Sequence, residues 1–223
     1  MKFNVGSKVI IVDDGPGSME FRVGLTKTGD RVKSFVHSLL QVNDYYVSPD
    51  EFFTSFTEEV TIKEGGPTLV RNSYSFLKKR AVDKESNGEI LFIGYPLVEE
   101  GSLDINSLKS LVQKVIAVFP QLVYIPHRRE SEKTLMVLGE VLEVRKLGMP
   151  FELYLAENEN LPRCLISYFS SILFNTKNMF GKAIQLSHIR LRDYQSPHYD
   201  DLDQLYERIE SISEELLEYS IKR

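Results

Sequence analysis

Hydrophobic residues recur at regular spacings after residue 88, and this regularity predicts alternating strands and helices. Short, strongly apolar runs indicate buried strands, which we expect at 89–95, 122–125, 149–155, 162–168 and 182–186. Apolar residues three or four positions apart indicate helices, which we expect at 103–119, 131–144 and 199–221. Because such alternation produces a parallel sheet with helices on both faces, residues 89–223 predict a Rossmann-like α/β domain.

The pattern is less regular before residue 88. We expect a strand at 8–12, a helix at 30–40 and a short helix with a basic end at 73–80. Aromatic residues crowd the segment 45–57, which fits either strands or a packed loop. The polar segment 84–88 resembles a linker, so we expect a domain boundary there and a shortened N-terminal α/β portion at 1–88.

Composition narrows the classes of protein that fit. The 223 residues are 42% hydrophobic and 26% charged, which suits a globular protein with a core. A net charge of −5 argues against nucleic acid as a partner, because no basic excess exists to neutralise phosphates. The single cysteine, Cys164, lies in an apolar run, so we expect a core residue and a reducing compartment.

The sequence shows no zinc-type spacing among its four histidines and one cysteine. It also has no apolar run of the roughly 18 residues that a membrane span needs, and no long apolar signal region at the N-terminus. We therefore expect a soluble cytoplasmic protein. Peripheral association with the inner face of a membrane stays open.

Polar residues that could act in catalysis or ligand binding follow three of the expected strands. Asp13 and Asp14 precede Gly15 in a turn, where neighbouring carboxylates raise one pKa and favour a base. Pro126 ends the strand at 122–125, and His127, Arg128 and Arg129 follow it. Ligands bind at the carboxyl ends of strands in such sheets, and guanidinium groups pair with phosphate or carboxylate. The alternative is a charged surface loop, just as an acidic turn is the alternative for the aspartates.

Ser170 and Ser171 lie between the strand expected at 162–168 and the next apolar segment. Hydroxyls and free backbone N–H groups at such a point bind anions, and the alternative is an ordinary helix N-cap. The chain has neither a G-x-G-x-x-G fingerprint nor a G-x-x-x-x-G-K-[ST] loop, which disfavours dinucleotide and P-loop chemistry.

Together, the order Asp-Asp-Gly, Pro-His and Ser-Ser at strand ends resembles the motifs of bacterial sialyltransferases. These include lipooligosaccharide sialyltransferases and capsular polysialyltransferases, which carry a D/E-D/E-G motif, an HP motif and serine motifs. The resemblance is strongest over residues 89–190. It implies the GT-B architecture of two Rossmann domains, with the nucleotide-sugar-binding half at 89–223 and the acceptor side at 1–88.

The resemblance also implies a chemistry, in which sialic acid passes from CMP-sialic acid to a glycan acceptor by inverting displacement, with no metal or other cofactor. Asp13 or Asp14 would be the base that takes the acceptor's proton. His127 would contact the donor phosphate and assist the departure of CMP, and a protonated imidazole would stabilise the growing negative charge. Pro126 and Arg128 share its loop. Ser170 and Ser171 would bind the phosphate or carboxylate region of the donor.

The sequence departs from that family in two respects. The family's motif places proline after histidine, whereas here Pro126 precedes His127 and Arg128 follows it. The acidic motif begins at residue 13, so we expect less than a full first domain before residue 89. Three alternatives follow: a minimal enzyme, a relative that truncation has inactivated, or a chain that borrows parts from a second copy in a homodimer.

Other functions stay open beside this one. The strand-end anion sites suit a transferase for another nucleotide sugar. They also suit a non-catalytic nucleotide-sugar-binding or partner protein in surface-polysaccharide assembly, or an interaction domain without a ligand. The aromatic segment 45–56 fits an acceptor site or core packing. The long C-terminal helix expected at 199–221 fits a dimer surface or a cover for the sheet.

Overall fold

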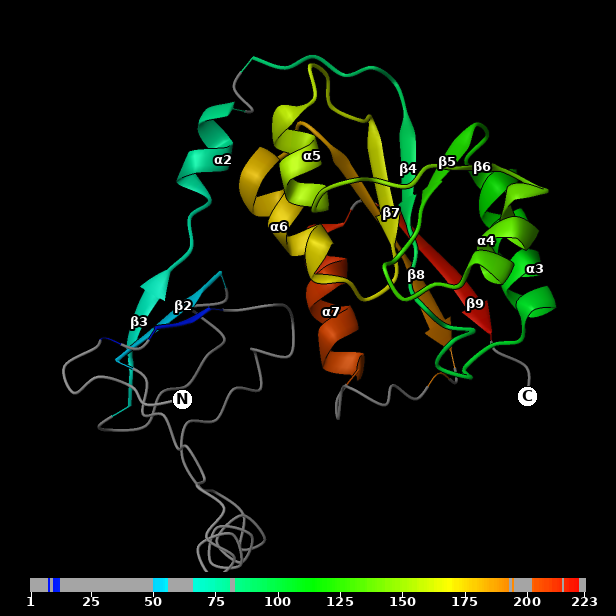
Figure 1. Cartoon of the computed structure of the whole chain (residues 1–223), viewed down its shortest axis with the longest axis horizontal. Helices are drawn as coiled ribbons and strands as arrows, with labels where there is room; N and C mark the ends of the chain where they lie inside the picture. Colours follow the sequence, from blue (N-terminus) through cyan, green and yellow to red (C-terminus); the bar gives the residue numbers. More distant parts are fainter. Residues whose placement is uncertain are drawn as a thin grey trace, which may run out of the picture. The chain divides into compact units, whose positions relative to one another are not determined.

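The computed structural model divides the chain into two compact units, Met1–Ser73 and Tyr74–Arg223 (Figure 1). The structure describes residues 8, 10–12, 50–55, 66–80, 83–192, 194, 202–213 and 215–220.

The first unit contains a small parallel sheet. Its strands β1 (Ile10–Val12), β2 (Glu51–Thr54) and β3 (Thr68–Arg71) lie in the order β1-β2-β3. The strand expected at 8–12 is confirmed, and β2 shows that part of the aromatic segment is a strand. In β2, Phe52 and Thr54 are buried while their neighbours are half-buried, the alternation of a strand with one covered face. The helix expected at 30–40 lies outside the described residues.

The second unit is built on a larger parallel sheet. Its strands lie in the order β6-β5-β4-β7-β8-β9, and every neighbouring pair is parallel. They are β4 (Ile90–Ile93), β5 (Leu122–Ile125), β6 (Glu143–Val144), β7 (Cys164–Ser167), β8 (Gln185–Arg192) and β9 (Glu215–Ser220). The chain starts in the middle at β4, runs outward to β6, and then crosses back to β7 beside β4. This is a Rossmann-like order, and its reversal point between β4 and β7 is where such sheets bind ligands.

Helices cover both faces of this sheet, as expected (Figure 1). One face carries α3 (Ile105–Val118) and α4 (Glu132–Gly139), which follow β4 and β5. The other carries α5 (Phe151–Glu157), α6 (Ser171–Phe180) and α7 (Leu202–Ile212), and the short α2 (Ser75–Arg80) packs on α5 and α6. No helix in the described part of the chain is long and apolar enough to cross a membrane.

The core lies between the sheet and these two helical layers. All four residues of β4, of β5 and of β7 are buried, because a strand covered on both faces has no side that meets water. The α3 helix contributes a buried stripe of Leu108, Leu111, Val112 and Val115, and Asp104 caps its start. Cys164 is buried in β7, which confirms its expected place in the core.

One predicted strand is a helix. Residues 149–155 were expected to form a strand, but Phe151–Glu157 is α5. Pro150 stands at its N-cap and breaks the extended run, and Glu152 lies in the first turn. Phe151 and Leu155, four positions apart, are both buried, which is helical spacing that the short apolar run concealed.

Two predicted helices end early and give way to edge strands. The helix expected at 131–144 ends at Gly139, and Glu143–Val144 pairs with β5 as β6. The helix expected at 199–221 ends at Ile212, and Glu215–Ser220 pairs with β8 as β9 over six residue pairs. Ser213 follows the last helical residue, and both its backbone N–H and its hydroxyl donate to the Ile209 carbonyl. Pairing with an existing sheet then outweighs the helical spacing of the leucines that follow.

The division between the units falls at residues 73 and 74, so the segment 74–88, which we assigned to the N-terminal portion, belongs to the second unit. Ser86 forms an isolated bridge with Leu161 there. The Lys84 ammonium donates to the carbonyls of Leu155, Ala156 and Asn158 and thereby caps the end of α5. The polar composition of 84–88 therefore marks a docked segment.

Candidate functional site

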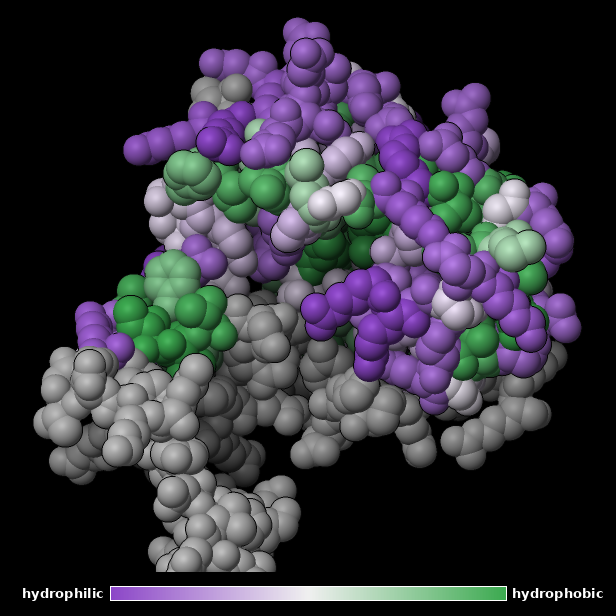
Figure 2. All heavy atoms as spheres, in the orientation of Figure 1, coloured by the Kyte–Doolittle hydropathy of each residue, from purple (hydrophilic) through white to green (hydrophobic). Residues whose placement is uncertain are grey.

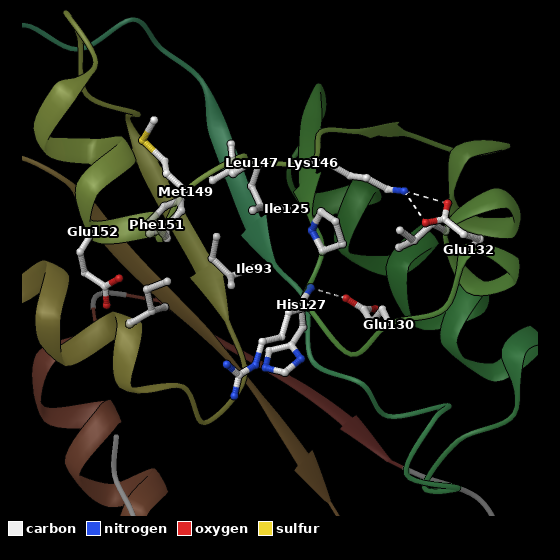
Figure 3. A pocket seen from close by; sticks show the side chains of 14 residues that line it. Ile93, Ile125, His127, Glu130, Glu132, Lys146, Leu147, Met149, Phe151 and Glu152 are labelled. Carbon is white, nitrogen blue, oxygen red and sulfur yellow. Dashed lines mark hydrogen bonds and ion pairs between the residues drawn. The ribbon is translucent and has the colours of Figure 1, made fainter. Parts of the chain in front are cut away.

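A cleft of about 530 Å³ opens at the carboxyl ends of β4 and β5 in the second unit (Figure 3). Its sides come from the loop after β5, the start of α4, the loop after β6 and the starts of α5 and α6. Apolar side chains line its interior, and Figure 2 shows hydrophobic residues in a hollow that hydrophilic residues border. The volume and this mixed lining are typical of a small-molecule site.

His127 stands in the loop after β5, where Pro126 has ended the strand, and both residues line the cleft. The ring is half-buried, and its Nδ1 accepts a 3.2 Å hydrogen bond from the Arg129 backbone N–H. A neutral imidazole in this arrangement carries its proton on Nε2. Burial lowers the pKa of His127, and Arg129 and Arg128 lower it further against a smaller opposing effect of Glu100. The free site therefore holds a neutral ring that donates through Nε2.

The backbone of this loop is fixed by Glu130, whose side chain is buried and 8% exposed. The His127 backbone N–H donates to Glu130 Oε2 at 2.6 Å (Figure 3), and the Tyr124 hydroxyl donates to Oε1 at 2.6 Å. Burial raises the pKa of Glu130 to about 7, although both hydrogen bonds act in the opposite direction. The carboxyl end of β5 therefore carries an acid that titrates near neutral pH.

The loop between β4 and α3 clamps the same segment from outside. Glu99 accepts from the Ser131 backbone N–H at 2.8 Å and from the Thr134 hydroxyl at 2.7 Å. Glu100 forms an ion pair with Arg129. Arg128, in contrast, lines the cleft, is exposed, and has no ion pair or hydrogen bond with any residue that the structure describes. Of the two adjacent arginines, one is structural and the other presents its charge to the cleft.

The opposite side of the cleft carries a carboxylate, Glu152, in the first turn of α5 (Figure 3). The Asn175 side chain donates a 2.7 Å hydrogen bond to Glu152 and accepts one of 2.7 Å from the Tyr74 hydroxyl. A second cation, Lys146, lines the cleft and is paired with Glu132 at 2.6 Å. A ligand in the cleft would therefore meet cationic groups near β5 and an anionic acceptor at α5.

Ser170 and Ser171 stand at the start of α6, after β7. Ser170 is the N-cap, and its hydroxyl accepts from the Ile172 N–H at 3.3 Å, as the capping interpretation expects. Ile172, the next residue along α6, lines the cleft, so the positive end of this helix lies at the cleft's border. The cap does not decide whether the serines also bind an anion, and that role stays a prediction.

Of the residues that the sequence singled out, Pro126, His127 and Arg128 line one cleft, and the two serines immediately precede Ile172, which also lines it. Asp13 and Asp14 lie outside the described residues, and β1 ends at Val12, just before them. Sequence reasoning missed Glu130, Glu152 and Lys146 as parts of the site. Glu152 and Lys146 have partners 23 and 14 residues away in the sequence. The partners of Glu130 are close in the sequence, but its role follows from its burial, which no sequence pattern reveals.

Among the described residues, no group of three or more histidine, cysteine, aspartate or glutamate side chains is arranged to hold a metal ion. The cleft offers the cations Arg128 and Lys146 and the carboxylate Glu152, groups that can pair with anionic groups and accept from hydroxyl groups. The comparisons with known proteins add no family: no family model matches the chain, and no curated protein matches it significantly.

Proposed function

We propose that the cleft binds the nucleotide-sugar donor CMP-sialic acid and that the chain is a sialyltransferase-like glycosyltransferase. The observation that carries this proposal is the joint placement of His127 and Arg128 in a cleft at the carboxyl edge of a Rossmann-like sheet, beside the start of α6. A phosphate at that place would receive hydrogen bonds from a neutral Nε2–H and from a guanidinium without another partner in the described residues.

The remaining parts of the cleft fit the rest of such a donor. Its apolar interior suits a base or sugar ring, and Glu152 can accept hydrogen bonds from hydroxyl or amino groups. A bound phosphate would also raise the pKa of His127, because an adjacent negative charge favours the protonated ring. The imidazole would then supply positive charge where the leaving CMP becomes more negative, an effect of order 3 kcal/mol in comparable sites.

In the proposed reaction an acceptor hydroxyl oxygen forms a bond to the anomeric carbon of sialic acid while the bond from that carbon to the phosphate oxygen breaks. The hydroxyl proton passes to Asp13 or Asp14, and CMP leaves with the bonding electron pair. His127 and Arg128 stabilise the departing phosphate, and Ser170 or Ser171 holds its oxygens. Arg128 replaces the proline of the resembled motif, and we assign it a phosphate contact.

A transfer assay with CMP-sialic acid and a panel of glycan acceptors tests this function. We expect CMP release that requires an acceptor, and we expect His127→Ala to abolish it while leaving the circular dichroism spectrum unchanged. Unchanged turnover in that variant would remove His127 from the mechanism.

The same assay separates the enzyme from a non-catalytic nucleotide-sugar-binding protein. If wild type binds CMP-sialic acid but no acceptor elicits turnover, the chain is a binding or partner protein and the catalytic part of the proposal is wrong. The Asp13→Asn and Asp14→Asn variants complete the test, because loss of transfer with retained donor binding is expected for the one that is the base.

A further inference from the structure

Glu130 is buried at the border of the cleft, and each of its carboxylate oxygens accepts a hydrogen bond from the protein itself. Oε2 accepts from the His127 backbone N–H and Oε1 accepts from the Tyr124 hydroxyl, each at 2.6 Å. We propose that Glu130 is a positioning residue whose ionised carboxylate holds His127 in its place and whose protonation releases it. The inference concerns the same cleft as the proposed function, and its ligand-binding consequence rests on that function.

The bonds between His127 and Glu130 run in both directions. The Glu130 backbone N–H donates to the His127 carbonyl at 3.0 Å, while the His127 N–H donates to the Glu130 carboxylate. Together with the bond from the Arg129 N–H to Nδ1, they fix the backbone and the imidazole of His127 at once. If the carboxylate bond is lost, the ring loses one of its anchors in the loop.

Space for the carboxyl group is provided by Gly94, just past the end of β4. A Cβ at this position would lie 2.6 Å from Tyr124 Cζ and closer still to Tyr124 Oη and Glu130 Oε2. Gly94 also donates its N–H to the Ile125 carbonyl at 2.9 Å, so it cannot easily move away. The sheet therefore contains a place for a buried acid, and the chain supplies Glu130 there.

The charged and titratable groups around Glu130 come from four directions. Glu99 lies in the β4–α3 loop, Tyr124 lies in β5 and Tyr168 lies at the end of β7. The loop that contains Glu130 also contains His127 and the two arginines. Burial and, to a smaller extent, Glu99 raise the pKa of Glu130 and the bonds from Tyr124 and His127 lower it, with a net value of about 7. The Tyr168 hydroxyl is buried and has no hydrogen-bond partner among the described residues. None of these neighbours supplies a cation in direct contact that would keep the carboxyl ionised in acid.

Below about pH 7 the carboxyl takes up a proton and has less capacity to accept from two donors at once. The bond to the His127 N–H then weakens, and the loop loses its fixed geometry. Protonation of His127 itself, whose pKa is lowered, comes at more acid pH and is a separate event.

The test follows the backbone amide of His127 by ¹H–¹⁵N NMR between pH 5.5 and 8.5 in the ligand-free protein. We expect this amide to titrate with a midpoint near 7 in wild type, to lose that titration in Glu130→Gln, and to keep it in the control Glu159→Gln, which changes an exposed glutamate. Tyr124→Phe keeps the bond to His127 but removes one that lowers the pKa, so its midpoint should rise. It also serves as the test if Glu130→Gln fails to fold.

A His127 amide that does not titrate near pH 7 in wild type, or that titrates unchanged in Glu130→Gln, would overturn the inference. Calorimetry with CMP at pH 8 tests the effect on ligand binding. Glu130→Gln should bind CMP roughly tenfold more weakly than wild type and Glu159→Gln do. If the amide titrates as expected but wild type binds no CMP, the positioning role of Glu130 stands and the proposed function fails, so the two failures are distinguishable.

Discussion

The Asn175 side chain on α6 donates a 2.7 Å hydrogen bond to Glu152 in the first turn of α5, and so ties two helices together at one side of the cleft. The same amide accepts from the Tyr74 hydroxyl, at the point where the chain enters the second unit. The direction in which Glu152 faces therefore depends on residues that do not themselves line the cleft.

Removing this support should impair the cleft without unfolding the protein. We expect Asn175→Leu to weaken CMP binding by about 3- to 10-fold, because a hydrogen bond to a charged group contributes about 1.5–3 kcal/mol and Glu152 keeps part of its hydration. Tyr74→Phe should have a smaller effect in the same direction. Equal affinity of Asn175→Leu and wild type in calorimetry would show that binding does not depend on the support that Asn175 gives to Glu152.

A methyl group at Gly94 should be costly. We expect Gly94→Ala to lower the free energy of unfolding by about 1–3 kcal/mol, because the added Cβ overlaps Tyr124 and Glu130 in a packed region. The matched control is Gly139→Ala at the end of α4, where a Cβ meets nothing within 4 Å and alanine favours the helix. Urea unfolding of both variants gives the comparison, and equal stability of the two would contradict this account of β4.

Glu130 should also make stability depend on pH. Its folded pKa of about 7 lies above the ordinary glutamate value of 4.5, so the folded state binds the proton more tightly than the unfolded state. Protonation of Glu130 therefore contributes to the free energy of unfolding in full below pH 4.5. This contribution is lost as the pH rises to 7, and a pKa difference of this size corresponds to about 3 kcal/mol. The buried histidines act in the opposite sense, so the measurement is the difference between wild type and Glu130→Gln.

That difference is obtained from urea unfolding at a series of pH values. Stability of Glu130→Gln relative to wild type should rise between pH 4.5 and 7 and then level off. A difference that stays constant over this interval would mean that Glu130 is ionised throughout.

Ser170 offers a way to separate a helix cap from an anion-binding group. Aspartate caps helices as well as serine does, so Ser170→Asp should change the free energy of unfolding by less than about 0.5 kcal/mol. Its charge would repel a phosphate at the start of α6, so we expect CMP binding to weaken at least tenfold. Retained binding with retained stability would show that Ser170 is a cap alone.

The sequence predicts the centre of the second sheet well and its edges poorly. β4, β5 and β7 are buried on both faces, so their apolar runs are unbroken and have one interpretation. β6 and β9 lie at the two edges, and each follows a helix closely enough that its residues continue the helical spacing. These segments become strands because they pair with the neighbouring strands β5 and β8. No pattern within their own sequences predicts this pairing.

The same distinction holds for the cleft. His127 and Arg128 come just after a strand, so the rule that ligands bind at the carboxyl ends of parallel strands predicts them from the sequence. Glu130 appears in the sequence as a charged loop residue, and its burial depends on the Tyr124 hydroxyl and on Gly94 just past the end of the neighbouring strand. Glu152 stood in a segment that we interpreted as a strand, so its place in the first turn of α5 came only from the structure.

The central claim is that the cleft beside His127 binds a nucleotide-sugar phosphate, and calorimetry with CMP-sialic acid tests it most directly. The protein is titrated as wild type, as Arg128→Ala and as the control Arg163→Ala, which removes an exposed arginine just before the amino end of β7. We expect wild type and Arg163→Ala to bind alike and Arg128→Ala to bind at least about tenfold more weakly, as loss of a charge-assisted hydrogen bond implies. Absence of binding to wild type at millimolar donor, or equal binding by all three proteins, would contradict the account.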